Sequence, residues 1–270
     1  MDDNLLRLAI FVGVLALMMC LEAAAPKRAR QQPRSQRWPT NLLLAAINTV
    51  CLKLLGPISA VIAAEYALDQ GWGVLAYSPI PLPLYMEVII GVILLDAAIY
   101  LQHVASHRIP FLWQFHKVHH ADRDIDTTTG IRFHPVEAVF SMAYKCIVVL
   151  LLGPIALAVI IFEVILNASA LFNHANVRLP TALDKLLRKV IVTPDFHRVH
   201  HSVIVRETNS NYGFFLSIWD RLGRTYIAQP QHQHQDMTIG LTSYQSPKPA
   251  ALSWCLTLPF RKIPKQEKSS

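Results

Sequence analysis

Charged residues and cysteines are scarce in this chain of 270 residues. Only 16% of the residues are Asp, Glu, Lys or Arg, whereas 53% are hydrophobic, and the mean hydropathy is +0.32. The four cysteines form no C-x-x-C pair, and three of them lie inside apolar runs. The cysteine pattern argues against a disulfide framework and against a thiolate metal site. The low charge is not typical of a soluble domain.

The hydrophobic residues are concentrated in four long runs. The first, Leu5–Ala25, is long enough at about 1.5 Å per residue to cross a bilayer. Runs at 41–68 and 82–101 follow, and a fourth at 136–172 is long enough for two passes divided by Gly153-Pro154. The sequence therefore predicts an all-α integral membrane bundle of about four to five passes.

The first run is followed, not preceded, by positive charge. A cleaved signal peptide needs a basic start, but this chain begins with Asp2 and Asp3. The sequence therefore favours a retained helix whose C-terminal end lies in the cytoplasm. Orientation and anionic lipids explain the net charge of +7, so we expect no nucleic-acid partner. The basic residues of this loop are Lys27, Arg28, Arg30, Arg34 and Arg37.

This orientation fixes the side on which later segments lie. With residues 26–40 in the cytoplasm, the loop at 69–81 is predicted outside, and residues 102–135 inside. If 136–172 is a hairpin, everything from Asn173 on, including the basic tail, is also inside. A single pass would instead put His174 on the opposite face. The hairpin predicts a multi-pass protein of the cell (inner) membrane with a cytoplasmic, histidine-rich helical cap.

Histidine is the residue type with the most uneven distribution. Ten of the twelve histidines lie between His103 and His201, and none precedes His103. Their spacings of three and four residues place several rings on one helical face, and neutral imidazole is a common metal ligand. One tetrahedral zinc needs four ligands, so about nine nitrogens are enough for two ions. Without thiolates, ligand chemistry favours a non-haem di-iron centre and leaves zinc and copper open.

The histidine clusters and their flanking residues resemble those of a known family. The matching pattern covers 96–226 and includes the segments 96–107, 112–120, 132–135, 193–201 and 219–222. It resembles the fatty acid hydroxylase / sterol desaturase superfamily of membrane di-iron oxygenases. The resemblance implies nine metal ligands: His103, His107, His116, His119, His120, His174, His197, His200 and His201. It also implies a second-shell or substrate-channel role for His134.

Several polar residues near the clusters have open roles. A ligating imidazole usually donates its other N–H to a carboxylate or carbonyl, and the candidates are Asp96, Asp122, Asp195 and Asp220. We expect Asp124 and Asp126 to lie in a solvated loop. We read His232 and His234 as surface residues. A short amphipathic helix is predicted between Pro180 and His201, and the stretch from Pro230 is expected to be an irregular tail.

The resemblance implies an enzyme that uses two iron ions and O2 to hydroxylate or desaturate a lipid C–H bond. Since no haem or flavin domain is recognisable, we expect a separate electron donor, such as a ferredoxin or a cytochrome b5-like protein with its reductase. Arg108, Lys117 and Arg198 are candidates to dock it. The alternatives are a haem electron carrier and a metal transporter. The predicted divisions are 1–95 (membrane helices), 96–226 (catalytic domain) and 227–270 (tail), and the lipid itself is not determined.

Overall fold

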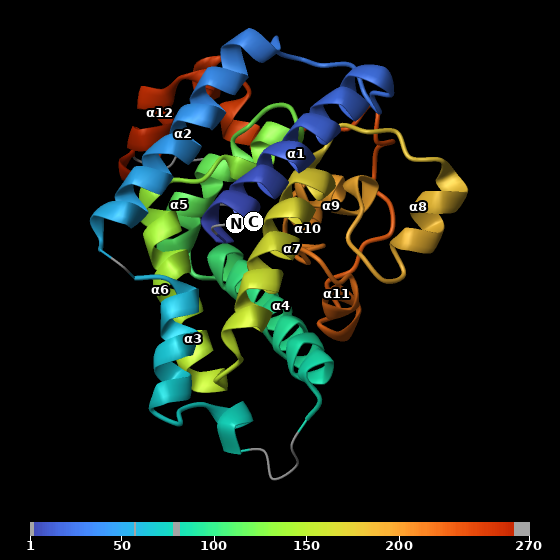
Figure 1. Ribbon diagram of the computed structural model, residues 1–270. Coiled ribbons are helices and arrows are strands. Elements are labelled where there is room, and N and C mark those ends of the chain that lie inside the picture. Colours follow the sequence, from blue (N-terminus) through green and yellow to red (C-terminus); the bar gives the residue numbers. More distant parts are fainter. Residues whose placement is uncertain (1–2, 57, 78–81, 262–270) are drawn as a thin grey trace.

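The computed structural model describes residues 3–56, 58–77 and 82–261 (Figure 1). Within these residues every regular element is a helix, which confirms the all-α prediction. In Figure 1, α3 (Ala60–Asp69) and the start of α4 (Leu84–Arg108) lie toward the lower end of the view, and α2 (Arg34–Leu54) and α12 (Leu252–Thr257) lie in its upper part. The α-helices are α1 (Asp3–Ala24), α2 (Arg34–Leu54), α3 (Ala60–Asp69), α4 (Leu84–Arg108), α5 (Pro110–His120), α6 (Pro135–Leu152), α7 (Ala156–His174), α8 (Thr181–Leu187), α9 (Pro194–His200), α10 (Val205–Thr208), α11 (Ile218–Leu222) and α12 (Leu252–Thr257).

Four described helices are long and apolar enough to cross a membrane: α1 from Leu5, α4, α6 and α7. Helices α6 and α7 form the predicted hairpin. Gly153 ends α6 with a φ of 65°, a left-handed conformation that glycine adopts without strain. A Cβ atom on Gly153 would also lie 2.4 Å from the Trp72 carbonyl oxygen, so only glycine fits this turn.

The run at 41–68 is not the single continuous helix that the sequence analysis expected. This run forms two helices, α2 and α3, and α2 is not among the helices apolar enough to span. The chain breaks after Gly56, whose φ is 87°, and Ser59 caps the start of α3 because its side chain accepts a hydrogen bond from the Ile62 amide. The first half of α2 carries buried Arg37 and Asn41, so it belongs to the histidine-rich end of the molecule.

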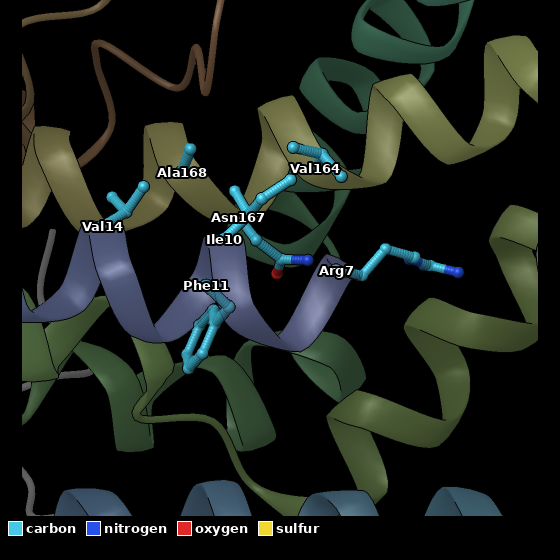
Figure 2. Close-up of a pocket in the computed structure, with 7 residues that line it drawn as sticks. All are labelled: Arg7, Ile10, Phe11, Val14, Val164, Asn167 and Ala168. Atoms are coloured by element: carbon cyan, nitrogen blue, oxygen red, sulfur yellow. The ribbon is translucent and has the colours of Figure 1, made fainter. Parts of the chain in front are cut away.

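Helix α1 is an integral part of this bundle. It packs along α7, leaving a cavity of about 20 Å³ between them that is lined by Ile10, Phe11 and Asn167 (Figure 2). Near its C-terminal end, Glu22 is fully buried and accepts hydrogen bonds from the Thr127 and Asn176 amides. A retained first helix is consistent with these contacts.

Three charged side chains inside the membrane-spanning helices are paired with one another. Glu163 of α7 forms ion pairs with Arg7 of α1 and with Lys145 of α6, the latter with an Nζ to Oε1 distance of 2.7 Å. Charges in a bilayer are costly unless they pair or face the bundle interior. This trio therefore links three helices at the place where each carries a charge.

Two of the hydrophobic cores in the described part of the chain lie toward opposite ends of the molecule. The membrane-side core contains Leu95, Ile99 and Phe162 from α4 and α7. A second core joins α2 and α5 to the C-terminal segment through buried Trp254 and Leu258. The prediction of an irregular tail is therefore wrong for residues 252–260, which form helices that pack into the cap. The basic tail at 262–270 lies outside the described residues.

Candidate metal centre

Two helices joined by a sharp turn supply five of the predicted ligands. His103 and His107, one turn apart, lie in the last two turns of α4. The chain then turns at Ile109, and Pro110 begins α5, a position where its missing N–H costs nothing. Helix α5 carries the other three, His116, His119 and His120.

The remaining ligands come from α7 and α9. His174 is the last residue of α7. Helix α9 begins with Thr193, whose side chain accepts a hydrogen bond from the Phe196 amide, and Pro194 follows in the first turn. These signals place His197, His200 and His201 on a single helical turn and its end. The structure thereby brings together all nine histidines, although they are distant in sequence.

The nine rings divide into two groups. In each group one nitrogen per residue lies within 4.8 Å of the others. Helix α5 contributes two rings to the group of five and one ring to the group of four. Helix α9 contributes one ring to the group of five and two rings to the group of four. The first group is His103, His107, His116, His120 and His200, and the second is His119, His174, His197 and His201.

Hydrogen bonds on the outer side fix the tautomers of several rings. The Nδ1 atoms of His103 and His200 lie 2.6 Å from the carbonyl oxygens of Tyr212 and Ser210. Since a carbonyl can only accept, each Nδ1 carries the proton and each Nε2 keeps its lone pair. These two Nε2 atoms nevertheless lie 3.1 Å apart. Two facing lone pairs repel, so this arrangement suits a cation between them.

The spacing of the nitrogens also fits a shared ion. An ion bound at about 2.1 Å places neighbouring ligand nitrogens about 3.0–3.4 Å apart, for right-angled to tetrahedral geometry. The Nε2 atom of His174 lies 3.1 Å from that of His119 and 3.1 Å from that of His197. Neither ring nitrogen of His120 or His201 has a hydrogen-bond partner among the described residues. Buried nitrogens without protein partners are the donors that a metal would satisfy.

The site is largely buried from solvent. Burial lowers the pKa of His119, His120, His197, His200 and His201 well below the usual histidine value. A metal needs the neutral form of histidine. Aromatic rings enclose the cluster and exclude water, with ring centroids about 5 Å from the imidazoles: Phe133 on His119 (4.8 Å), Trp113 and Tyr212 on His107 (4.9 and 5.0 Å), and Phe214 on His103 (5.1 Å).

One carboxylate of this site was missed in the sequence. Glu137 accepts a hydrogen bond from His116 Nδ1 through Oε1, at 2.5 Å. It lies in the first turn of α6, three residues after His134, and only the approach of α6 to α5 reveals its role. The signal available in the sequence was its position two residues after the His134-Pro135 pair, in the same segment as the histidines.

None of the four predicted carboxylates accepts a hydrogen bond from a ligand histidine within the described part of the chain. Asp96 accepts from the Trp219 indole and the Leu216 amide. Asp220 acts one step removed: it binds the Tyr212 and Gly213 amides, and the Tyr212 carbonyl then accepts from His103. Backbone carbonyls, and not the side chains of Asp96 and Asp220, therefore accept the hydrogen bonds from the imidazoles of His103 and His200.

Asp122 belongs to a network centred on Arg37. Arg37 is fully buried and forms two hydrogen bonds of 2.7 Å to Asp122 and one of 2.6 Å to Asp126. Asp124 accepts from the Gln31 and Gln32 amides. The prediction of a solvated loop is wrong, because Asp124 and Asp126 are both buried: Asp124 anchors the segment before α2 and Asp126 anchors the first turn of α2.

The basic loop is correspondingly less available to lipids than predicted. Besides Arg37, Arg28 is buried and donates to the carbonyls of His234 and Met237. Lys27 pairs with Asp195 at 2.6 Å. These cations serve the fold, so only part of the loop's charge can act at a membrane surface.

Asp195 forms a second buried network with Arg198 and His234, two side chains that the sequence analysis expected at the surface. Asp195 forms ion pairs with Arg198 and Lys27, and its Oδ2 lies 3.9 Å from His234 Nε2. His234 is therefore buried, contrary to prediction, whereas His232 is exposed as predicted. Arg198 is also fully buried, because these contacts draw it inward.

Two further assignments change. Lys117 is buried, so with Arg198 it cannot dock a partner, and only Arg108 of the predicted docking surface is exposed. His134 belongs to neither imidazole group. Its Nδ1 accepts from the Val136 amide at the start of α6, and its Nε2 donates to the Leu256 carbonyl. His134 therefore caps a helix and ties it to the C-terminal segment.

A family model described as fatty acid hydroxylase matches residues 88–225, the region that contains all nine histidines. The chain belongs to the fatty acid hydroxylase family. Membership supports the oxygenase interpretation rather than a haem carrier or a metal transporter. No solved structure gives a significant match.

Curated relatives of this fatty acid hydroxylase family member include three kinds of lipid enzyme. It is 31% identical to the ornithine lipid hydroxylase OlsE of Rhizobium tropici over 59% of this chain and 47% of that protein. It is 25% identical to alkylglycerol monooxygenase of Xenopus tropicalis over 56% of this chain and 32% of that protein. It is 27% identical to the delta(7)-sterol 5(6)-desaturase erg3B of Aspergillus fumigatus over 83% of this chain and 68% of that protein. The chain thus spans about half or less of the first two relatives.

Proposed function

We propose that this protein is a membrane-bound, O2-dependent di-iron oxidoreductase that hydroxylates or desaturates a C–H bond of a lipid. The observation that carries the proposal is the convergence of nine imidazoles into one group of five and one of four. Imidazole suits iron, and the described part of the site offers no thiolate ligand. The three relatives are all named for reactions on lipids.

In this proposal each group of histidines holds one iron ion, and the two ions supply the O2-dependent oxidation of an unactivated C–H bond. The residues of the chain orient and protect that chemistry. Carbonyls of Tyr212 and Ser210 and the carboxylate of Glu137 hold the outer ring nitrogens, which fixes ring orientation. Phe133, Trp113 and Tyr212 exclude water from the inner nitrogens.

We place the site at the cytoplasmic face of the cell membrane. Exposed basic residues accompany the histidine-rich end, whereas the described part of the opposite loops carries Asp69 and no base. Cytoplasmic loops are richer in Lys and Arg, so this distribution supports the orientation. The exposed cations of the described residues include Arg30, Arg108, Arg178, Lys185 and Lys189. They would also suit docking of an acidic ferredoxin or cytochrome b5-like donor.

The proposal is tested by lipid analysis under labelled oxygen. Membranes containing the protein, supplied with iron, a ferredoxin or cytochrome b5 and its reductase, are exposed to ¹⁸O2 and the lipids are analysed by mass spectrometry. Hydroxylation adds one labelled oxygen, and desaturation removes two hydrogens without label. We expect His200→Ala to abolish the product and His232→Ala, at an exposed histidine outside the site, to leave it unchanged. Product formation that survives His200→Ala contradicts the proposal.

A further inference from the structure

A cavity of about 230 Å³ lies directly beneath the two imidazole groups, between α2, α4, α6 and α7. Gly130, Phe133 and Phe214 line its upper end. Phe133 stacks on His119 of one group, and Phe214 contacts His103 of the other. A molecule in this cavity is therefore separated from each group by one aromatic ring.

Two hydrogen-bond acceptors that line this cavity have no donor. Glu137 Oε2 and Asn48 Oδ1 are buried and have no hydrogen-bond partner among the described residues. The other end of each side chain is held in place: Glu137 Oε1 accepts from His116, and Asn48 Nδ2 donates to the Phe133 carbonyl at 3.0 Å. These bonds orient both free oxygens. Buried acceptors are seldom left without donors, so the missing donors must come from what fills the cavity.

The rest of the cavity suits an apolar chain. Ile99, Leu166 and Met142 line it, and the paired Lys145 bounds it at the far side. Glu137 also lines a second cavity of about 500 Å³ between α4, α5 and α6, with Leu101, Phe140 and Ile147 among its walls. Glu137 thus stands where two apolar cavities meet next to a predicted metal ligand.

We propose that Glu137 and Asn48 form a subsite for a hydrogen-bond donor of the lipid substrate, a hydroxyl or an amide N–H. The inference rests on the proposed function and deepens it. If the donor is anchored here, the carbon that is oxidised lies within a few bonds of that donor and not far along the lipid tail. Glu137 has two separate tasks: Oε1 positions His116, and Oε2 binds substrate.

Two variants separate these tasks. In Glu137→Gln the amide oxygen continues to accept from His116, which turns the amide NH2 toward the cavity and replaces an acceptor by a donor. Asn48→Leu removes the second acceptor from a different helix. Thr49→Val is the matched control, since Thr49 is exposed on the same helix and bonds only to the Ala45 carbonyl.

The probes are two lipid pairs that differ only in donors. One pair is 1-O-hexadecylglycerol and its dimethyl ether, and the other is N-hexadecylacetamide and its N-methyl derivative. Competitive retention by the purified, iron-loaded protein is measured by native mass spectrometry. We expect the wild-type protein to retain the donor-bearing member of at least one pair about tenfold better, the effect of one hydrogen bond to a charged or buried acceptor. The pair that shows it distinguishes hydroxyl from amide.

In Glu137→Gln and Asn48→Leu we expect this ratio to fall to about twofold or less, with iron content unchanged, while Thr49→Val keeps it. A wild-type ratio near one for both pairs, or a ratio unaffected in both variants, overturns the inference. Retention that depends on the donor, without any O2-dependent product, would instead overturn the proposed function and support the subsite.

Discussion

Two buried polar regions lie side by side in the cap and differ in how their groups are satisfied. Around Arg37, the buried guanidinium and its carboxylates are paired, with distances of 2.6–2.7 Å to Asp122 and Asp126. In the histidine cluster, the Nε2 atoms of His103 and His200 face each other without a proton between them. A buried network that is complete serves the fold. One that is incomplete, with all its lone pairs converging, indicates a ligand.

The largest effect on activity should come from removing one imidazole that faces the proposed iron site. His200→Ala deletes a ligand of the group of five, and we expect oxidase activity to fall to background and iron content to drop, while the protein stays folded. Iron per chain, measured by plasma mass spectrometry, and the thermal unfolding midpoint test this together. If iron content in His200→Ala equals that of His232→Ala, the contrast between the two regions fails.

Removing the cation of the complete network should affect folding and not metal binding. Arg37→Ala leaves Asp122 and Asp126 buried and unpaired, and we expect a loss of about 3–5 kcal/mol in the free energy of unfolding. Denaturation in detergent measures it, with exposed Arg30→Ala as control. Iron content per folded molecule should stay unchanged. A variant that folds normally but loses iron would show that this network serves the metal.

The loss of folding stability at low pH should depend on the same ion pairs. Burial raises the pKa of Asp122, but Arg37 outweighs this and lowers it from 3.8 to about 2. Because the folded pKa is the lower one, the stabilisation is complete above about pH 4 and is lost as the pH falls toward 2. It amounts to about 2 kcal/mol. Acid unfolding of metal-free wild type and Asp122→Asn, in which histidine protonation is common to both, isolates this difference.

The smallest effect should come from a partly buried residue at the edge of the Arg37 network. Trp38 donates from its indole nitrogen to Asp126 at 3.1 Å and is only partly buried. Trp38→Phe keeps the ring but loses this bond, so we expect a loss of about 1 kcal/mol. Denaturation compared with the wild type measures it. A loss as large as that of Arg37→Ala would mean that the indole, and not the guanidinium, organises the region.

The helices and the histidines were predictable because they depend on short-range patterns. Apolar runs predicted α1, α4 and the hairpin of α6 and α7, and spacings of three and four residues placed His116, His119 and His120 on one face. The run at 41–68 misled because hydrophobicity alone does not register a break at Gly56. His234 and Asp124 were misjudged because a polar residue in a polar segment gives no sign of a partner distant in sequence.

The sequence by itself therefore determined which side chains are available for a metal, since local periodicity sets the face on which each ring lies. Tertiary structure decided how they are shared. The division into five and four follows from the packing of α4, α5, α7 and α9, which brings His103 beside His200, 97 residues away. The same packing buried Arg37 among carboxylates and placed Glu137 against His116. Such pairings depend on how the helices meet in space, which no local pattern encodes.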